Sequence, residues 1–437
     1  MKKSKFNYFF EVDGKKLAFN AMSCGLAEID QDFEEIYENI DHIVYSDLEE
    51  KKQKIVDMMS EGFYIIDNDM DEIALLKFRN NKGKYNDRFI SFVIAPTMAC
   101  NFACPYCYEK AKPGIMGQDI QDKIIELAKE AAEQKKDIDF TWYGGEPLLA
   151  KKVIYSLSER AIKICEENKV NYSASIITNG YLIEEEDVEL FRKYKIESVQ
   201  ITVDGTREIH NTRRVLKNGG EGTFDIIINN IKKLYKKCAI SLRVNIDKTN
   251  IQDTMNLIDY FKEEGLDQLF VNFGHVSPYT ENNQAIKSKC LSVEQYSKES
   301  LKLQEYLYIK GFRSSGFPYY PGIKANYCGA DSISTFVIDP EGYKYKCWNE
   351  VGDKRVAVGN IMWEAKDVPD KMIAREVSYM TWSPFESEDC KECFLLPICM
   401  GGCPYTGKAL GKNHCERWKY SLQEVLKKTY EQKQTCV

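Results

Sequence analysis

Three cysteines stand close together in the first third of this chain of 437 residues, in the run Cys100-Asn-Phe-Ala-Cys104-Pro-Tyr-Cys107. The C-x3-C-x2-C spacing places three thiolates on one short loop, which is typical of a metal site. A [4Fe-4S] cluster has four irons, so three cysteines leave one iron open to a small molecule. Four-cysteine ferredoxin runs leave no such position. A zinc site and three buried thiols are the alternatives.

The same run has an aromatic residue, Tyr106, directly before its third cysteine. With that residue the spacing resembles the radical S-adenosylmethionine (SAM) enzymes. The resemblance implies that Cys100, Cys104 and Cys107 hold a [4Fe-4S] cluster whose open iron takes the amino and carboxylate groups of SAM. An electron then cleaves SAM into methionine and a 5'-deoxyadenosyl radical. By the same resemblance Tyr106 lies near the adenine.

The middle of the chain, residues 88–285, alternates short apolar runs with helical segments, which favours a parallel α/β fold. We expect six strands, at 90–95, 138–142, 173–177, 199–203, 240–244 and 269–273. Six such units match the partial (β/α)6 barrel of the radical SAM family. The chemistry of parallel barrels sits at the C-terminal ends of the strands, and the motifs of this chain follow those ends.

Three further motifs at these strand ends are expected to bind SAM. Tyr143-Gly-Gly-Glu-Pro147 resembles the family's GGE motif: its glycines let the backbone approach the methionine moiety, and its glutamate accepts from the ammonium group. Asn179 follows the third strand and faces the adenosyl group. The segment from Thr202 to Arg214 resembles the S-x-D-G...H-x3-R segment of peptide-modifying relatives. The resemblance implies that Thr202 hydrogen-bonds SAM and that Arg214 pairs with its carboxylate, although Arg213 makes the arginine ambiguous by one residue. The implied SAM contacts are Tyr106, Gly144, Gly145, Glu146, Asn179, Thr202 and Arg214.

A second set of seven cysteines follows in residues 326–437 and resembles the complete pattern of the SPASM domain. The resemblance implies two auxiliary [4Fe-4S] clusters, so that the enzyme holds three in all. Zinc ribbons need four ligands for each ion and fit seven cysteines poorly. One auxiliary cluster is assigned Cys390, Cys393, Cys399 and Cys415, and the other Cys328, Cys347 and Cys403.

Seven cysteines do not supply four ligands to each of two clusters. The fourth ligand of the Cys328 cluster is therefore open, a thiolate of the substrate, or Cys290, the nearest cysteine upstream. We hypothesise that this iron is open, because an open iron can bind a substrate cysteine and lower the pKa of its thiol. Such a site suits thioether formation.

The first 85 residues predict a small winged-helix-like domain. Asp13-Gly14 between two apolar-rich runs is a hairpin signal, residues 31–40 have helical spacing, and Asp71 begins a further helix. Ser46 and Glu49 have the spacing of a capping box for a helix that ends near Gly62. The unit resembles the leader-peptide recognition domains of enzymes that modify ribosomally made peptides, in which the leader adds a strand to a sheet edge. A domain that merely covers one end of the barrel is the alternative. Residues 286–325 are expected to form a helical bridge to the SPASM domain.

The composition favours neither nucleic acid nor membrane as a partner. The formal net charge is -7, with 43% hydrophobic and 29% charged residues, and no apolar run is long enough for a membrane span. The N-terminus has no signal-peptide pattern, so we expect a cytoplasmic protein. In that compartment its 15 cysteines are poor candidates for disulfides.

These observations together predict a radical SAM/SPASM maturase that joins a cysteine sulfur to a carbon of a precursor peptide with a leader. A flavodoxin or ferredoxin-type reductant is the expected electron donor, and no catalytic side chain is assigned. The alternatives are a maturase that makes carbon-carbon or carbon-oxygen links, and an anaerobic sulfatase-maturing enzyme, which usually begins close to its first motif. A non-catalytic electron carrier needs no SAM pocket.

Overall fold

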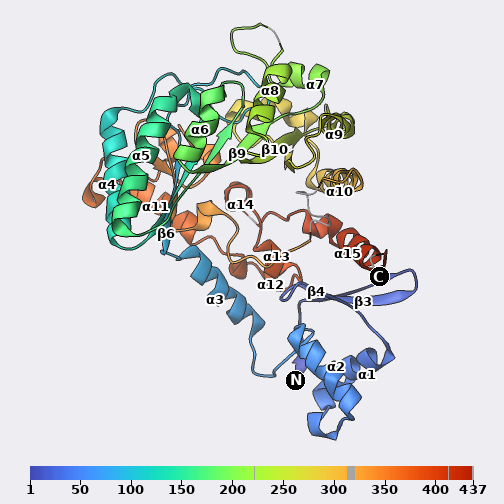
Figure 1. Ribbon diagram of the computed structural model, residues 1–437. Helices are drawn as coiled ribbons and strands as arrows, with labels where there is room; N and C mark the ends of the chain where they lie inside the picture. Colours follow the sequence, from blue (N-terminus) through green and yellow to red (C-terminus); the bar gives the residue numbers. More distant parts are fainter. Residues whose placement is uncertain (221, 313–319, 412, 436–437) are drawn as a thin grey trace. The chain divides into compact units, whose positions relative to one another are not determined.

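A nine-stranded sheet organises the middle of the chain in this computed structural model, which describes residues 1–220, 222–312, 320–411 and 413–435. Its order is β11-β10-β9-β8-β7-β6-β12-β13-β14 (Figure 1). All six predicted strands form and pair in parallel, which confirms the α/β fold class. The strands are β6 (Phe89–Ile94), β7 (Asp137–Trp142), β8 (Tyr172–Thr178), β9 (Ile196–Thr202), β10 (Ala239–Ile246), β11 (Phe270–His275), β12 (Thr335–Ile338), β13 (Tyr343–Tyr345) and β14 (Gly359–Asn360).

The sequence analysis did not foresee that β12 extends this sheet. It pairs in parallel with β6, with Val337 opposite Val93, and β13 and β14 continue from it in antiparallel order. Residues that we assigned to the C-terminal cysteine-rich domain therefore complete the sheet of the central domain.

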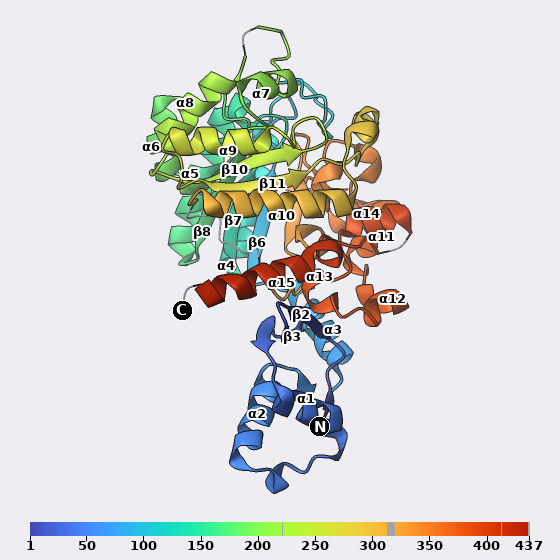
Figure 2. The same ribbon diagram turned by 90° about the vertical axis from the view of Figure 1, so that its right-hand side faces the viewer.

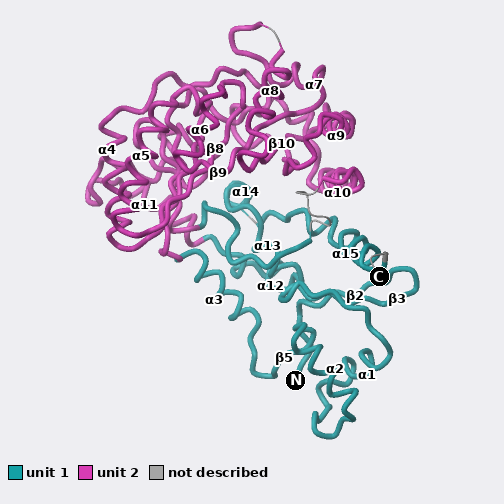
Figure 3. Tube along the Cα trace, viewed as in Figure 1, with its two compact units in different colours: residues 1–85, 318–331, 382–437 teal, residues 86–317, 332–381 magenta. Residues whose placement is uncertain are grey.

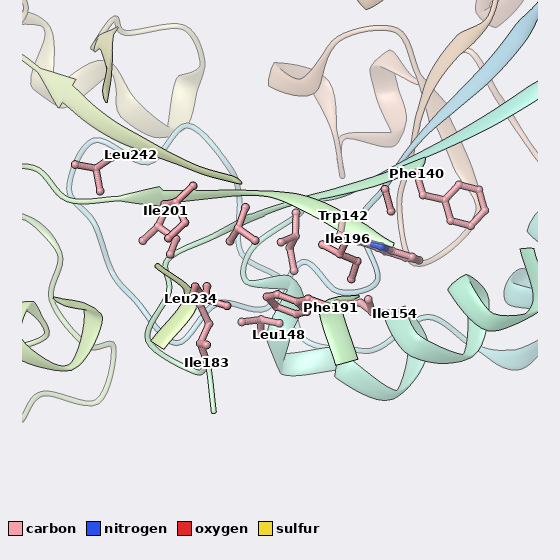
Figure 4. Close-up of a cluster of buried hydrophobic side chains, with 14 of the residues drawn as sticks. Phe140, Trp142, Leu148, Ile154, Ile183, Phe191, Ile196, Ile201, Leu234 and Leu242 are labelled. Carbon is pink, nitrogen blue, oxygen red and sulfur yellow. The ribbon is translucent and has the colours of Figure 1, made fainter. Parts of the chain in front are cut away.

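Helices between the parallel strands cover the sheet, as the α/β pattern predicts (Figures 1 and 2). Their buried faces join the strands in one large hydrophobic core, where Phe140 and Trp142 are fully buried (Figure 4). The helices of this region are α4 (Gln118–Glu133), α5 (Lys151–Asn168), α6 (Glu185–Lys193), α7 (Arg207–Arg213), α8 (Phe224–Leu234), α9 (Thr254–Glu263), α10 (Val293–Ile309) and α11 (Asp370–Met380).

The N-terminal residues form a three-stranded antiparallel sheet in the order β2-β3-β4, with helices after it. The predicted hairpin is present: Asp13 and Gly14 both have positive φ, at 49° and 76°, as a tight two-residue turn requires. The elements are β1 (Lys2–Lys3), β2 (Asn7–Val12), β3 (Lys15–Asn20), β4 (Gly25–Glu28), β5 (Ile65–Ile66), α1 (Gln31–Asn39), α2 (Glu50–Glu61) and α3 (Glu72–Lys84).

Two helix starts in this region were predicted, and one prediction was wrong. Asp71 caps α3 by accepting from the amide of Ala74 at 3.0 Å. The box of Ser46 and Glu49 does not form, because α2 begins at Glu50 without a side-chain cap and the Ser46 hydroxyl donates to Asp47 at 3.1 Å. A short 3-10 turn, Tyr45–Asp47, takes up the segment that the box would need.

The chain divides into two compact units, which Figure 3 colours separately. Unit 1 comprises residues 1–85, 318–331 and 382–437, and unit 2 comprises residues 86–317 and 332–381. The cysteine-rich part of unit 1 has the short helices α12 (Glu388–Lys391), α13 (Leu396–Cys399) and α14 (Pro404–Leu410), and the long helix α15 (Trp418–Thr435). The predicted boundary at residue 326 is thus not the boundary of a unit, and part of the predicted bridge at 286–325 lies outside the described residues.

None of the helices in the described ranges combines the length and the apolar character that crossing a membrane requires.

Replacing Phe140 by alanine should destabilise unit 2 strongly. The ring is fully buried and contacts the rings of Phe92, Trp142 and Tyr172 at centroid distances of 5.8, 5.6 and 5.5 Å. We expect a loss of roughly 3–5 kcal/mol in the free energy of unfolding, because the core cannot close over the cavity. Urea unfolding of the metal-free protein measures it. Phe78→Ala, at a ring that is 65% exposed on α3, is the control, and equal losses for both would contradict the assignment of the core.

Candidate functional site

The three-cysteine loop leaves the C-terminal end of β6 and is held in place by backbone hydrogen bonds on two sides. The amides of Ala103 and Lys217 bond to the carbonyls of Val215 and Asn101, at 2.9 and 2.8 Å, so residues 215–217 flank the start of the loop. On its other side, the amide of Met116 returns to the carbonyl of Pro96 at 2.8 Å. A long irregular loop thereby acquires a fixed path at the strand end.

The Gly144-Gly145-Glu146 segment, after β7, packs directly against this loop. A Cβ atom on Gly144 would lie 2.4 Å from the carbonyl oxygen of Thr97, and one on Gly145 would lie 2.3 Å from that of Ala99. Gly144 also has a φ of +113°, which favours glycine. The glycines are therefore needed for close approach to the cysteine loop itself, a role that the sequence analysis did not assign to them.

The carboxylate of Glu146 is buried, with 1% of the residue exposed, and the protein holds it firmly. It accepts hydrogen bonds from the Thr178 hydroxyl and the Asn179 amide, both at 2.7 Å, and from the Leu148 amide at 3.0 Å. Burial raises the pKa of this carboxyl, and these bonds oppose the rise. A carboxylate has about four acceptor positions, so one remains for a ligand.

Asn179 links this carboxylate to the cysteine loop. Its side-chain amide donates to the side-chain oxygen of Asn101, the residue that follows the first cysteine, at 2.8 Å. Its own side-chain oxygen accepts from the amide of Tyr181 at 2.9 Å. Asn179 thus lies beside the cysteine loop and bonds to neighbouring residues with both ends of its side-chain amide.

The two adjacent arginines differ clearly in their partners. Arg213 donates to the Asp247 carboxylate at 2.8 Å and to the carbonyl of Asn245 at 3.0 Å, and its Nε lies 3.8 Å from Asp204. Arg214, which is 7% exposed, donates to the Tyr106 hydroxyl at 2.8 Å, and none of the ion pairs among the described residues includes it.

Arg214 is therefore the arginine with capacity for an anionic ligand. The Nε atoms of both arginines have no hydrogen-bond partner in the described part of the chain, but Arg213 is paired with Asp247, whereas the Arg214 guanidinium lies 5.4 Å from the ring of Phe102 in the cysteine loop. A buried guanidinium without a carboxylate is costly unless a ligand supplies one. This difference favours Arg214 over Arg213 for the predicted SAM carboxylate.

Tyr106 and Thr202 complete the set of predicted SAM contacts. The Tyr106 hydroxyl donates to the buried carboxylate of Asp204, so this tyrosine is tied to the segment after β9. Thr202 is the last residue of β9 and is 8% exposed. All seven predicted contacts thus lie on the cysteine loop or at the ends of β7, β8 and β9 or on the segments that follow them.

The surroundings of the three thiols fit an iron-sulfur cluster. Burial raises the pKa of Cys100 to about 12 and raises the pKa values of Cys104 and Cys107 as well. Three such thiols ionise together only beside a concentrated positive charge, which the irons of a cluster provide. No group of three or more His, Cys, Asp or Glu side chains in the described ranges is placed to hold a metal ion. A cubane binds each thiolate at a separate iron, so its ligands need not converge on one point.

Four of the C-terminal cysteines surround one cavity of unit 1. Cys390, Cys393, Cys399 and Cys415 all line a cavity of about 750 Å³. The Asn413 side-chain amide donates to the Cys390 sulfur at 3.0 Å. This is the set that the resemblance assigns to one auxiliary cluster.

The other predicted auxiliary set comprises Cys328, Cys347 and Cys403. Cys328 and Cys403 belong to unit 1, and Cys347 belongs to unit 2. The buried Asp331 carboxylate accepts from the Cys328 amide at 2.9 Å and shapes that loop. The Cys290 thiol donates to the carbonyl of Ile286 at 3.4 Å. The assignment of these residues to a cluster stays a prediction.

The sequence analysis missed an acidic and aromatic group beside the third cysteine. The Glu109 carboxyl is buried, burial raises its pKa to about 8, and its Oε2 atom has no hydrogen-bond partner in the described ranges. It bonds to Tyr143, whose hydroxyl also bonds to Tyr108 and whose ring lies 4.6 Å from that of Trp348. The sequence did contain a signal for this group, because Glu109 stands two positions after the predicted ligand Cys107. This group is suited to contact a polar part of a substrate.

Comparisons with known proteins agree with this geometry. Residues 94–289 match the model of the radical SAM superfamily. The chain is 26% identical over 337 residues, which are 72% of this chain and 87% of the other, to the cysteine-type anaerobic sulfatase-maturating enzyme of Clostridium novyi (strain NT).

Two solved structures share the fold. Native anSMEcpe with bound AdoMet and Cp18Cys peptide matches with a TM-score of 0.59 and 23% identity, over 77% of this chain and 97% of the other. Streptococcus suis SuiB bound to precursor peptide SuiA matches with a TM-score of 0.54 and 16% identity, over 95% of this chain and 97% of the other.

Replacing Arg214 should weaken SAM binding without unfolding the protein, whereas replacing Arg213 should mainly destabilise it. A charge-assisted hydrogen bond is worth about 1.5–3 kcal/mol, so we expect roughly 10- to 150-fold weaker SAM binding for Arg214→Gln. Arg213→Gln removes the positive charge that faces the buried carboxylates of Asp204 and Asp247 and should lower the melting temperature. Calorimetric SAM titration and thermal unfolding distinguish them, and a reversed pattern would assign the ligand to Arg213.

Proposed function

We propose, from the premise that this chain is a radical SAM enzyme, that it modifies a ribosomally made precursor peptide. The modification that we infer joins a cysteine sulfur of the peptide to a carbon atom of another residue. The observation that supports a peptide substrate is a groove along the edge strand β2 of unit 1. The support for the thioether is the seven-cysteine set, which leaves one auxiliary iron without a protein thiolate.

The groove has the size and lining that an extended peptide needs. Strand β2 pairs only with β3 in its sheet, so its outer edge has backbone groups for an added strand. Beside it lies a cavity of about 820 Å³. Phe9, which lines this cavity, is 40% exposed, and the centroid of its ring lies 5.1 Å from that of Tyr37. The lining residues are Phe9, Phe10, Glu11, Lys16, Leu17, Ile29, Gln31, Phe33, Glu34, Glu35, Tyr37 and Glu38.

The aromatic lining of this groove defines the peptide that it fits. Four glutamates and one lysine also line it, but Glu34, Glu35 and Glu38 are paired with Lys16, Lys52 and Lys3. The aromatic residues accept apolar side chains, which in an added strand point the same way at every second position. We infer a leader segment that is extended and alternates apolar residues with others. A related fold is known with a precursor peptide bound, that of SuiB with SuiA.

The residues of unit 2 bind and orient the cofactor in this proposal. A [4Fe-4S] cluster on Cys100, Cys104 and Cys107 supplies the electron that cleaves SAM to the 5'-deoxyadenosyl radical. Arg214 pairs with the SAM carboxylate, and the remaining acceptor position of Glu146 receives a hydrogen bond from its ammonium group. Both groups are fixed by buried partners, so they position the ligand without having to reorganise.

In the net reaction the peptide is oxidised and loses two hydrogens. The substrate C–H bond breaks, and its hydrogen atom passes to the deoxyadenosyl radical to give 5'-deoxyadenosine. The cysteine thiol would lose a proton as the C–S bond forms, and an auxiliary iron-sulfur cluster held by the C-terminal cysteines would accept the remaining electron. We assign two such clusters to the C-terminal cysteines, three clusters in all, and a flavodoxin or ferredoxin-type protein as the reductant.

A second candidate function is the oxidation of a sulfatase cysteine to formylglycine. The observation that favours it is the 26% identity to a cysteine-type sulfatase-maturating enzyme over 72% of this chain. The groove along β2 favours peptide crosslinking instead, because it offers a docking edge for a leader. A carbon-carbon or carbon-oxygen crosslink would use the same site on another substrate.

Anaerobic turnover should distinguish these functions. The reconstituted enzyme is incubated with SAM, a strong reductant and a short cysteine-rich peptide encoded beside its gene. We expect 5'-deoxyadenosine and a peptide that loses two hydrogens for each crosslink, with its cysteines protected from alkylation. Replacement of the sulfur by an aldehyde oxygen would support the formylglycine function, and free cysteines in a crosslinked peptide would support another bond. Cys104→Ala should produce no deoxyadenosine.

Substitutions in the groove should impair leader capture without affecting SAM cleavage. A phenyl group that the bound leader covers contributes about 1.5–3 kcal/mol, so Phe9→Ser should weaken binding of the fluorescently labelled precursor roughly 10- to 100-fold. Glu35→Lys/Glu38→Lys, which breaks the ion pairs with Lys52 and Lys3 beside the groove, should also weaken it. Fluorescence anisotropy with the holoenzyme measures both. Glu61→Lys, an exposed glutamate outside the groove, is the control, and unchanged affinity in the groove variants would contradict this docking site.

A further inference from the structure

Four consecutive backbone carbonyls of the cysteine loop accept hydrogen bonds from one distant segment. The Thr280 hydroxyl donates to the carbonyl of Tyr108 at 2.9 Å. The side-chain amide of Asn282 donates to the carbonyls of Cys107 and Glu109, at 3.0 and 2.8 Å, and that of Asn283 donates to the carbonyl of Tyr106 at 3.3 Å. Every carbonyl from residue 106 to residue 109 is thus bound by a side chain of residues 280–283.

These donors come from the far end of the parallel sheet. They belong to the segment between β11 and the 3-10 helix η4 (Glu281–Lys289) and to the first turns of η4. Strand β11 is the edge strand of the sheet, whereas the cysteine loop follows β6, and four strands separate β11 from β6. The hydrogen bonds therefore connect segments that follow two distant strands, at the edge of the sheet where the thiols lie.

The donors are themselves well held. Asn283 is 2% exposed, donates a second bond to the carbonyl of Ser277 at 3.0 Å, and accepts from the Thr280 amide at 3.1 Å. Asn282 is exposed, yet both hydrogens of its side-chain amide are used on the cysteine loop. An irregular loop cannot satisfy its carbonyls by regular secondary structure, so it depends on such donors.

We propose that Thr280, Asn282 and Asn283 form a carbonyl clamp that positions the cysteine loop for its cluster. The clamp acts on the carbonyl of Cys107 itself and on those of its neighbours, so it fixes the backbone that carries the third ligand thiol and the amides beside it. Hydrogen bonds to the sulfurs stabilise the more negative, reduced form of an iron-sulfur cluster and so raise its reduction potential. The clamp thereby controls both retention and potential of the first cluster.

Asn282 is the residue to test, because it is at the surface and its substitution leaves the core unchanged. Asn282→Asp keeps the shape, loses both donors and places a carboxylate against two carbonyls. Asn282→Leu removes the donors without adding charge. Gln284→Leu is the matched control, since Gln284 is an exposed amide of the same helix that donates to Pro278 and Thr280 within its own segment.

The measurements concern the first cluster alone. The spectrum of a C100A/C104A/C107A variant is subtracted to isolate it, and its reduction potential is titrated by electron paramagnetic resonance. We expect chelator-driven iron release roughly tenfold faster or more in both Asn282 variants, from the loss of two hydrogen bonds, with a potential shifted to more negative values. Gln284→Leu should behave as the unsubstituted enzyme. Unchanged iron release and potential in the Asn282 variants, or equal changes in Gln284→Leu, would overturn the clamp.

This inference rests on the cluster site of the proposed function and not on the peptide chemistry. If the C100A/C104A/C107A variant bound as much iron as the unsubstituted enzyme, the cluster assignment itself would be wrong. If it bound less and the Asn282 variants retained their iron, the clamp alone would be wrong. Melting temperatures of the metal-free variants are compared as well. If the variants that release iron faster also have lower melting temperatures, general destabilisation would explain the release, and this would count against the clamp.

Discussion

The contact between two strand ends at Gly144 and Gly145 is the constraint on which the rest of the site depends. The carbonyls of Thr97 and Ala99 occupy the positions where side chains at these residues would lie. The amide of Glu146 bonds to Ala99 at 2.9 Å, which fixes the carboxylate that follows. Any side chain at either glycine would separate the cysteine loop from the end of β7. The hydrogen bonds to the buried Glu146 carboxylate would then be disrupted, and the segment 144–146 would no longer pack against the cysteine loop.

The polar groups around the loop form two arms that meet at it. One arm runs from Glu146 through Asn179 to Asn101. The other runs from Arg214 to Tyr106, which is itself a residue of the loop, and on to Asp204. A buried polar group is stable only when its partners are in place, so each arm holds the loop and is held by it. The cysteine loop is thus rigid although it lacks regular secondary structure.

The sequence predicts the strands and the strand-end motifs because their signals are local. Apolar runs identify β6 to β11, and the glycines of the GGE motif and the Asp13-Gly14 turn require particular backbone conformations. It does not predict the clamp, because Asn282 and its neighbours read as an ordinary polar loop and their partners lie more than 170 residues away. For the same reason the pairing of β12 with β6 was missed. Ser46 and Glu49 have the spacing of a capping box, but the box does not form because a 3-10 turn at Tyr45–Asp47 takes up this segment.

The charges on the two arms also explain why an amino acid ligand suits this site. Glu146 and Arg214 both act on the Cys100 thiol, the first raising and the second lowering its pKa, so the loop lies between a buried negative and a buried positive group. A ligand with one charge would leave the other group uncompensated, at a cost of several kcal/mol for a buried ion. A zwitterion, with its ammonium toward Glu146 and its carboxylate toward Arg214, satisfies both. The amino and carboxylate groups of SAM are such a pair, and they are the groups that the resemblance to radical SAM enzymes assigns to the open iron.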